Sequence, residues 1–178
     1  MRDFKGHYWR LGNRREIMMI TANDMMYLRR CVELATEALE AGDEPFGSVL
    51  VDGDGHVLHE DRNRANSVDA TYHPEIAVAK WAAANMTAEA RANAVVYTSG
   101  EHCAMCSAAH AWAGLGRIVY VSSSKQLDEW MEEMGVTSTS PINSLSIQEV
   151  APNVSVQGPI VGLDAEIKVL QQRAFQRR

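Results

Sequence analysis

The sequence YHPE at residues 72–75, together with EHCAMC at residues 101–106, is the most informative part of this chain. The imidazole of His73 and the thiols of Cys103 and Cys106 are ligand types that zinc prefers, and three protein ligands leave a fourth coordination position open. Glu75 lies two residues from His73, close enough to act on a metal-bound water without being a ligand itself. The two segments therefore predict a metal site, for which the rest of the chain has to supply a scaffold and a pocket.

The spacing of these residues resembles that of the zinc-dependent cytidine and purine deaminase superfamily, which has His-x-Glu followed after some thirty residues by Cys-x-x-Cys. The resemblance implies that His73, Cys103 and Cys106 bind Zn²⁺ and that Glu75 moves protons from water to the leaving amine. It also implies a three-layer α/β/α cytidine deaminase-like fold, with a mixed central sheet of about five strands flanked by helices.

The resemblance extends beyond the metal ligands and covers about residues 23–121. PFG at 45–47 is similar to the Pro-Phe-Gly-Ala of guanine-type deaminases, and DATYHPE at 69–75 is similar to their Asp-Pro-Thr-Ala-His-Ala-Glu. The family also has a base-binding Asn upstream of the zinc His, for which Asn63 is the nearest candidate and Asn66 the alternative. The predicted substrate contacts are therefore the Asn63 side chain, Phe46, the backbone N–H of Cys103, and His102, which replaces a family proline.

Length and composition indicate one globular domain. A chain of 178 residues with 46% hydrophobic content is long enough for one buried core and short for two. We expect the core at about 23–135, an N-terminal extension at 1–22, and a C-terminal segment at 136–178 that ends in a helix.

Charge and cysteine content indicate the compartment and the class of partner. A net charge of −6, with the basic residues gathered near the two ends, argues against a nucleic-acid partner, which requires clustered Lys and Arg. The three cysteines do not form a disulfide framework, and Cys31 lies in an apolar helical pattern. Since no apolar run is long enough to cross a bilayer and the first residues lack the apolar core of a signal peptide, we expect a cytoplasmic protein.

The periodicity of apolar residues predicts alternating helices and strands. Helical spacing predicts helices at 24–41, 74–86, 103–115, 125–134 and 161–175. Apolar runs on both sides of DGDG (52–55) predict a β-hairpin of 45–51 and 56–60, followed by a loop at 61–72. Further strands are predicted at 94–98 and 117–121, and the alternation from 94 to 134 indicates a βαβ crossover with parallel neighbouring strands. Short apolar stretches at 147–150 and 154–156 are candidates for small strands.

Several of these residues have alternative interpretations. A purely structural zinc site needs a fourth ligand, but His102 is badly placed beside Cys103, and His110 is expected to serve helix packing. Trp81 and Trp112 are expected in the core or in a dimer contact, with base stacking as the alternative. The hairpin histidines His56 and His59 are expected at the surface. The Asn63 side chain suits a loop cap as well as it suits a base contact.

The leading hypothesis is a zinc-dependent hydrolase that releases ammonia from a small nucleobase or nucleoside, most closely of the guanine type, and that forms a homodimer. One alternative is a tRNA-specific adenosine deaminase, which would be expected to carry a basic surface and a basic C-terminal helix. A cytosine or triazine-type deaminase is another. A binding protein with a vestigial metal site is disfavoured because Glu75 is intact.

Overall fold

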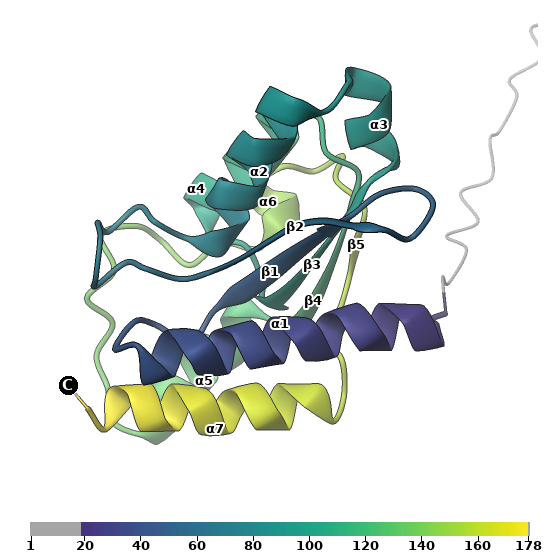
Figure 1. Cartoon of the computed structure of the whole chain (residues 1–178). Helices are drawn as coiled ribbons and strands as arrows, with labels where there is room; N and C mark the ends of the chain where they lie inside the picture. The colour runs from purple at the N-terminus through teal and green to yellow at the C-terminus, as the bar shows by residue number, and fades with distance from the viewer. Residues whose placement is uncertain (1–18, 178) are drawn as a thin grey trace, which may run out of the picture.

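The computed structural model describes residues 19–177 and contains a five-stranded mixed sheet between two layers of helices (Figure 1). Residues 1–18, most of the predicted N-terminal extension, lie outside the described residues. The strands are ordered β2-β1-β3-β4-β5. β1 pairs antiparallel with β2 and β3, whereas β3, β4 and β5 are parallel. Their bounds are β1 Gly47–Val51, β2 Val57–Arg62, β3 Val95–Gly100, β4 Arg117–Ser122 and β5 Val156–Gln157. The predicted α/β/α fold, hairpin and βαβ crossover are confirmed.

Seven described helices form the outer layers and a short connection (Figure 1). One layer contains α1, α5 and α7; the other contains α2, α4 and α6, while α3 leads into β3. Their bounds are α1 Ala22–Glu40, α2 Pro74–Asn85, α3 Ala88–Asn93, α4 Ala104–Ala113, α5 Ser124–Glu133, α6 Ile147–Val150 and α7 Leu163–Phe175.

The two faces of the sheet bury alternate side chains of the same strands. In β1, Val49 and Val51 pack in the cluster with α1 and α7, whereas Leu50 packs in the cluster with α2. Alternation follows from the pleat of a strand, in which successive side chains point to opposite faces. Because both faces are covered by helices, β1 reads as a continuous apolar run, as strands buried on both faces do.

Several predicted elements differ from the structure. The stretch 147–150, predicted as a small strand, is helix α6, because Ser146 and Glu149 form a capping box that starts a helix there. The second candidate strand is present as β5. Helix α3 was not predicted, although Thr87 caps it by accepting a hydrogen bond from the backbone N–H of Ala90. β2 continues to Arg62, into the segment predicted as loop.

The carboxyl ends of β3 and β4 form the edge at which the candidate site lies, as expected for parallel strands. Glu101, directly after β3, connects three segments at this edge. Its backbone N–H donates to the carbonyl of Ser122 over 2.8 Å. Its carboxylate accepts the backbone N–H groups of Ser124 over 2.9 Å and Ile147 over 3.0 Å. Glu101 thereby fixes the first residues of α5 and α6 relative to the loop that carries Cys103.

No helix within residues 19–177 has the length and apolar composition that crossing a bilayer requires.

Candidate active site

Two helix N-termini bring the predicted metal ligands together. His73 is the N-cap of α2 and Cys103 is the N-cap of α4, with Cys106 in the first turn of α4. Pro74 occupies the first turn of α2, where its missing N–H costs nothing because that group has no intrahelical partner. α2 and α4 pack against each other, so their N-terminal ends meet. The positive end of the α4 dipole favours thiolate at both cysteines.

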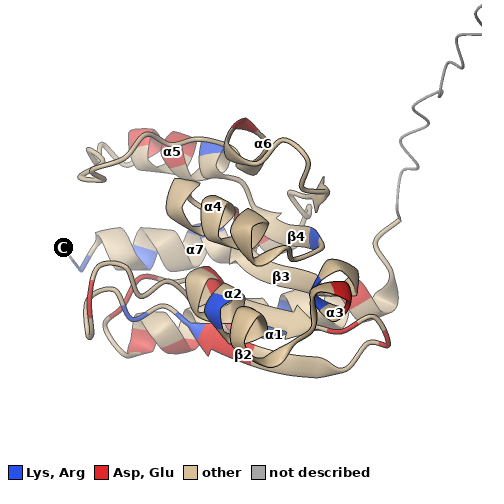
Figure 2. Cartoon of the chain, turned by 90° about the horizontal axis from the view of Figure 1, so that it is seen from above, with Lys and Arg blue, Asp and Glu red and all other residues tan. Residues whose placement is uncertain are grey.

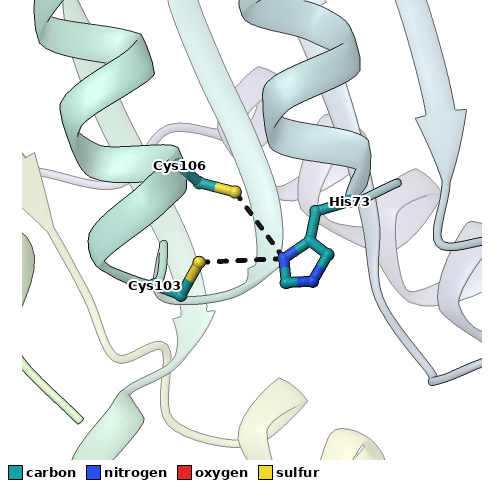
Figure 3. A group of neighbouring side chains, drawn as sticks. All are labelled: His73, Cys103 and Cys106. Atoms are coloured by element: carbon teal, nitrogen blue, oxygen red, sulfur yellow. Dashed lines mark hydrogen bonds between the residues drawn. The ribbon is translucent and has the colours of Figure 1, made fainter. Parts of the chain in front are cut away.

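The three side chains have the geometry of a zinc site (Figure 3). Nδ1 of His73 lies 3.7 Å from Sγ of Cys103 and 3.7 Å from Sγ of Cys106. Tetrahedral zinc, with bonds of about 2.3 Å to sulfur and about 2.0 Å to nitrogen, separates such atoms by about 3.6 Å. Among residues 19–177, no fourth His, Cys, Asp or Glu joins this group. The donor set therefore fits zinc with one position left for a non-protein ligand, the arrangement of catalytic sites.

The two thiols differ in acidity because one donates to the other. The hydrogen bond from Cys106 lowers the pKa of Cys103 to about 4, and His73 contributes in the same direction. The pKa of Cys106 is raised, first because it is that donor and then because it is buried. The pKa of His73 is raised, chiefly by its hydrogen bond with Cys103. Cys103 is thus the more readily ionised of the two cysteines, and thiolate is the form that binds metal.

Glu75 is held beside the ligands by buried hydroxyls. It is 5% exposed, and its Oε1 accepts a hydrogen bond of 3.2 Å from the Thr98 hydroxyl. The Ser48 hydroxyl in turn bonds to Thr98 over 3.0 Å. Cys106 Sγ lies 3.6 Å from the other Glu75 oxygen, Oε2. Burial raises the pKa of Glu75 above its ordinary value, which suits a group that must both accept and give up a proton.

A cavity of about 460 Å³ opens in front of these groups, a volume typical of small-molecule sites, which span roughly 300–1,000 Å³. His73, Glu75 and Cys103 line one end, α5 lines a side, and residues 138–145 line the rim. No Lys or Arg is among the lining residues within the described part of the chain. The lining residues are Phe46, His73, Glu75, Gly100, Glu101, Cys103, Ser122, Ser123, Ser124, Leu127, Asp128, Met131, Ser138, Ser140, Ile142, Asn143, Ser144, Leu145 and Gln171.

The two candidate asparagines occupy different positions. Asn63 is buried and its backbone N–H donates to the carbonyl of Phe46, a cavity-lining residue. Asn63 Oδ1 accepts the backbone N–H of Ala65 over 2.8 Å, so this oxygen caps the loop. Asn66 instead donates its Nδ2 to the carbonyl of Gly42 at the surface. Asn63 is not among the residues that line the cavity, and a contact of its Nδ2 with a substrate stays a prediction.

His102 lies behind the site. Its ring is 1% exposed, packs edge-on against His110 with 5.5 Å between ring centres, and does not line the cavity. Among the described residues neither of its ring nitrogens has a partner, and its substrate contact stays a prediction. His110 bonds through Nε2 to the carbonyl of Gly116 over 2.9 Å, which agrees with its expected packing role.

The tryptophans and hairpin histidines divide between core and surface. Trp81 stacks on His59 with ring centres 5.2 Å apart, at the margin of the core. His56 is exposed, as expected. Trp112 is 91% exposed on α4, so the expectation of a core position is wrong for it, whereas a dimer contact stays open.

Sequence patterns did not identify Thr98 as part of the site. It lies in the apolar run of β3 and is completely buried, so the periodicity marked it only as a strand residue. A hydroxyl in a run of buried apolar residues is the signal that could have been used, because a buried hydroxyl requires a partner.

We expect Thr98→Val to lower kcat by about tenfold through loss of the hydrogen bond that orients Glu75, with KM and zinc content unchanged. Thr98→Ser should restore most of kcat because it returns the hydroxyl. Thr36→Val is the control, since the Thr36 hydroxyl donates to the backbone carbonyl of Val32 within α1, away from the site. Steady-state kinetics on the four proteins provide the test. Equal turnover of the Val and Ser variants at position 98 would contradict the positioning role.

This chain is similar to a deaminase family and to several known deaminases. The MafB19-like deaminase family matches residues 22–167. A probable cytosine deaminase of Schizosaccharomyces pombe is 30% identical over 152 residues, 83% of this chain and 91% of that protein. A tRNA-specific adenosine deaminase of Agrobacterium fabrum is 39% identical over 94 residues, 50% of this chain and 61% of that protein. The structure of guanine deaminase from Bacillus subtilis superposes with a TM-score of 0.52 at 27% identity, covering 72% of this chain and 89% of the other.

Proposed function

Because this chain belongs to the MafB19-like deaminase family, and so is a hydrolytic deaminase, we propose that it is a zinc enzyme that releases ammonia from a free nucleobase or nucleoside. A guanine-type compound is the first candidate substrate. The observation that carries this proposal is the group of His73, Cys103 and Cys106 with Glu75 beside it, at one end of a cavity of small-molecule size.

The proposed mechanism assigns one role to each side chain. His73, Cys103 and Cys106 would hold the zinc, which, when bound, makes hydroxide available near neutral pH. Glu75 takes one proton of the attacking water and delivers it to the ring nitrogen beside the amino-bearing carbon. It then takes the second proton from the new hydroxyl on that carbon and delivers it to the leaving amine, as the C–N bond breaks and the carbonyl forms. Thr98 keeps the Glu75 carboxyl turned towards the reacting atoms. The backbone N–H of Cys103, at the start of α4, would donate a hydrogen bond to the attacked centre.

Charge supports a small substrate over tRNA. The cavity lining contains Glu75, Glu101 and Asp128 but, within the described residues, no Lys or Arg. Binding to a polynucleotide depends on basic contacts to phosphates. A free base carries no phosphate and needs none of these contacts, and its recognition would rest on hydrogen bonds inside the cavity.

Cytosine is the second candidate substrate. It is favoured by the long match to the probable cytosine deaminase of S. pombe, which extends over 91% of that protein. The guanine candidate is favoured by the PFG sequence at 45–47 and by the likeness to the B. subtilis guanine deaminase structure.

An ammonia-release screen of the zinc-loaded protein tests the proposal. The panel is guanine, cytosine, adenine, a triazine, their nucleosides where these exist, and tRNA. We expect turnover of one or two free bases or nucleosides and none of tRNA. Activity confined to tRNA would overturn the small-substrate assignment, and no ammonia from any compound would overturn the proposed function.

We also propose a homodimer that associates through α2 and α4. α4 has no charged residue and exposes Trp112, and Lys80 is the exposed charge of α2 (Figure 2). A second copy presents the same uncharged surface, so a two-fold axis would bury both at once. Light scattering should then give about twice the 19.7 kDa chain mass.

The cytoplasm is the compartment that we propose. All three cysteines are free thiols, and two of them would have to stay reduced to bind zinc. Reducing compartments maintain that state.

A further inference from the structure

The C-terminal helix α7 places one polar side chain in the interior. Its other buried residues are apolar: Leu163, Ile167, Leu170 and Ala174. Gln171 is only 1% exposed. Burying an amide is unfavourable unless a hydrogen-bond partner replaces water. The buried Gln171 amide therefore requires a hydrogen-bond partner.

No described residue supplies that partner. No hydrogen bond, ion pair or ring contact joins the Gln171 side chain to another residue in the described range. The fully enclosed polar atoms that lack a partner within residues 19–177 belong to His102 and His110. The Gln171 amide is therefore not sealed off, and the space that it lines is the cavity in front of Glu75.

Three other polar residues of the same lining, Glu101, Ser122 and Ser123, are already engaged. Both carboxylate oxygens of Glu101 accept backbone N–H groups. The Ser122 hydroxyl donates to the carbonyl of Ser99 over 3.0 Å, and the Ser123 hydroxyl caps α5. Gln171 differs from these residues because, within residues 19–177, neither the donor nor the acceptor of its amide has a partner.

Gln171 also reaches the cavity from the layer opposite the metal ligands. α7 lies with α1 on one face of the sheet, whereas the helices that carry His73, Cys103 and Cys106 lie on the other (Figure 1). A flat heterocycle that presents its amino-bearing carbon to Glu75 thus has a different edge available to Gln171.

We propose that Gln171 is a substrate-binding residue that recognises a heterocycle edge in which a carbonyl adjoins a ring nitrogen. The amide N–H₂ donates to the carbonyl, and the amide oxygen accepts from a ring N–H where one is present. Guanine has such an edge at its carbonyl and the adjoining ring N–H, and free cytosine has one as well, on the side of its carbonyl away from the amino-bearing carbon. The inference rests on the proposed function and specifies the chemical feature by which that site selects its substrate.

The test compares bases that have or lack this edge. Glu75→Gln protein, loaded with zinc so that bound bases are not turned over, is titrated calorimetrically with guanine and with 2-aminopurine, which lacks the carbonyl. A second protein carries Gln171→Leu in addition, and the control carries Gln172→Leu, the neighbouring glutamine of α7 that does not line the cavity. If the screen yields a pyrimidine substrate, cytosine and 4-aminopyrimidine replace the purines.

We expect Gln171→Leu to weaken binding of the carbonyl base by about tenfold or more and to change binding of the base without the carbonyl by less than about twofold, because that base makes no such hydrogen bond. Gln172→Leu should leave both affinities and the zinc content unchanged. If Gln171→Leu weakened binding of both bases equally, its role would be structural and the inference would be overturned. The inference would also be overturned if binding of neither base weakened.

These outcomes are separable from failure of the proposed function. If the zinc-loaded wild-type protein binds no base and releases no ammonia, the proposed function fails, and the inference fails with it. If wild-type protein turns a base over while Gln171→Leu leaves the preference between the paired bases unchanged, only the assignment of Gln171 fails.

Discussion

Glu75→Gln is expected to lower kcat by about 10²–10⁴-fold or more while leaving one zinc per chain. The amide keeps the size of the carboxyl and can still bond to Thr98, but it cannot carry a proton from water to the substrate. Because Glu75 is not one of the three ligands, the metal should remain. Ammonia release and elemental analysis of the same preparation measure the two quantities together.

The matched control for this variant is Glu89→Gln, a change of the same chemistry on the exposed surface of α3. It should have wild-type kinetics. Wild-type activity of Glu75→Gln would show that some other group moves the proton, and loss of zinc from that variant would show that Glu75 contributes to metal binding.

Removal of the metal is expected to abolish turnover, and one equivalent of zinc should restore it. The dialysed protein loses the source of hydroxide, whereas its fold, which contains a large core away from the site, should remain. Zinc should also raise the melting temperature, because a ligand that binds only the folded state stabilises it. Circular dichroism, melting curves and activity before and after readdition provide the measurements.

His73→Ala should lower both the zinc content and kcat, since it removes one of three ligands. His56→Ala is the control, because His56 belongs to a separate group with Asp52 and Asp54 on the hairpin that we do not expect to bind zinc. A second zinc per chain that disappears in His56→Ala would show that the hairpin group binds metal, and retention of full activity by His73→Ala would refute the assigned ligand set.

The sequence was informative where a chemical requirement coincides with a local pattern. His73, Cys103 and Cys106 were identifiable because they are ligand residue types at the spacing His-x-Glu and Cys-x-x-Cys, which is visible without any knowledge of packing. The β-hairpin followed from DGDG at 52–55. In contrast, α6 was mistaken for a strand because a stretch of four residues with two apolar positions is too short to establish a period, and its capping box decided the outcome.

Residues that join the site through tertiary packing could not be found in this way. Gln171 follows Cys106 by more than sixty residues and lies in an ordinary amphipathic pattern. Only the packing of α7 beneath the sheet brings it to the cavity. Asp128 and the segment 138–145 likewise reach the lining through the placement of α5 and of the loop that follows it.

The two hydrogen bonds of the Glu101 carboxylate have a consequence for how selectivity can change. They fix the chain at Ser124 and again at Ile147, so α5 and the loop that follows it are anchored at both ends by one side chain. Closing a longer loop between fixed ends costs little extra entropy. Insertions, deletions or randomised libraries confined to residues 138–145 should therefore alter which compounds enter, while the catalytic groups keep their positions. Laboratory evolution towards new amino-heterocycles would best begin in that segment.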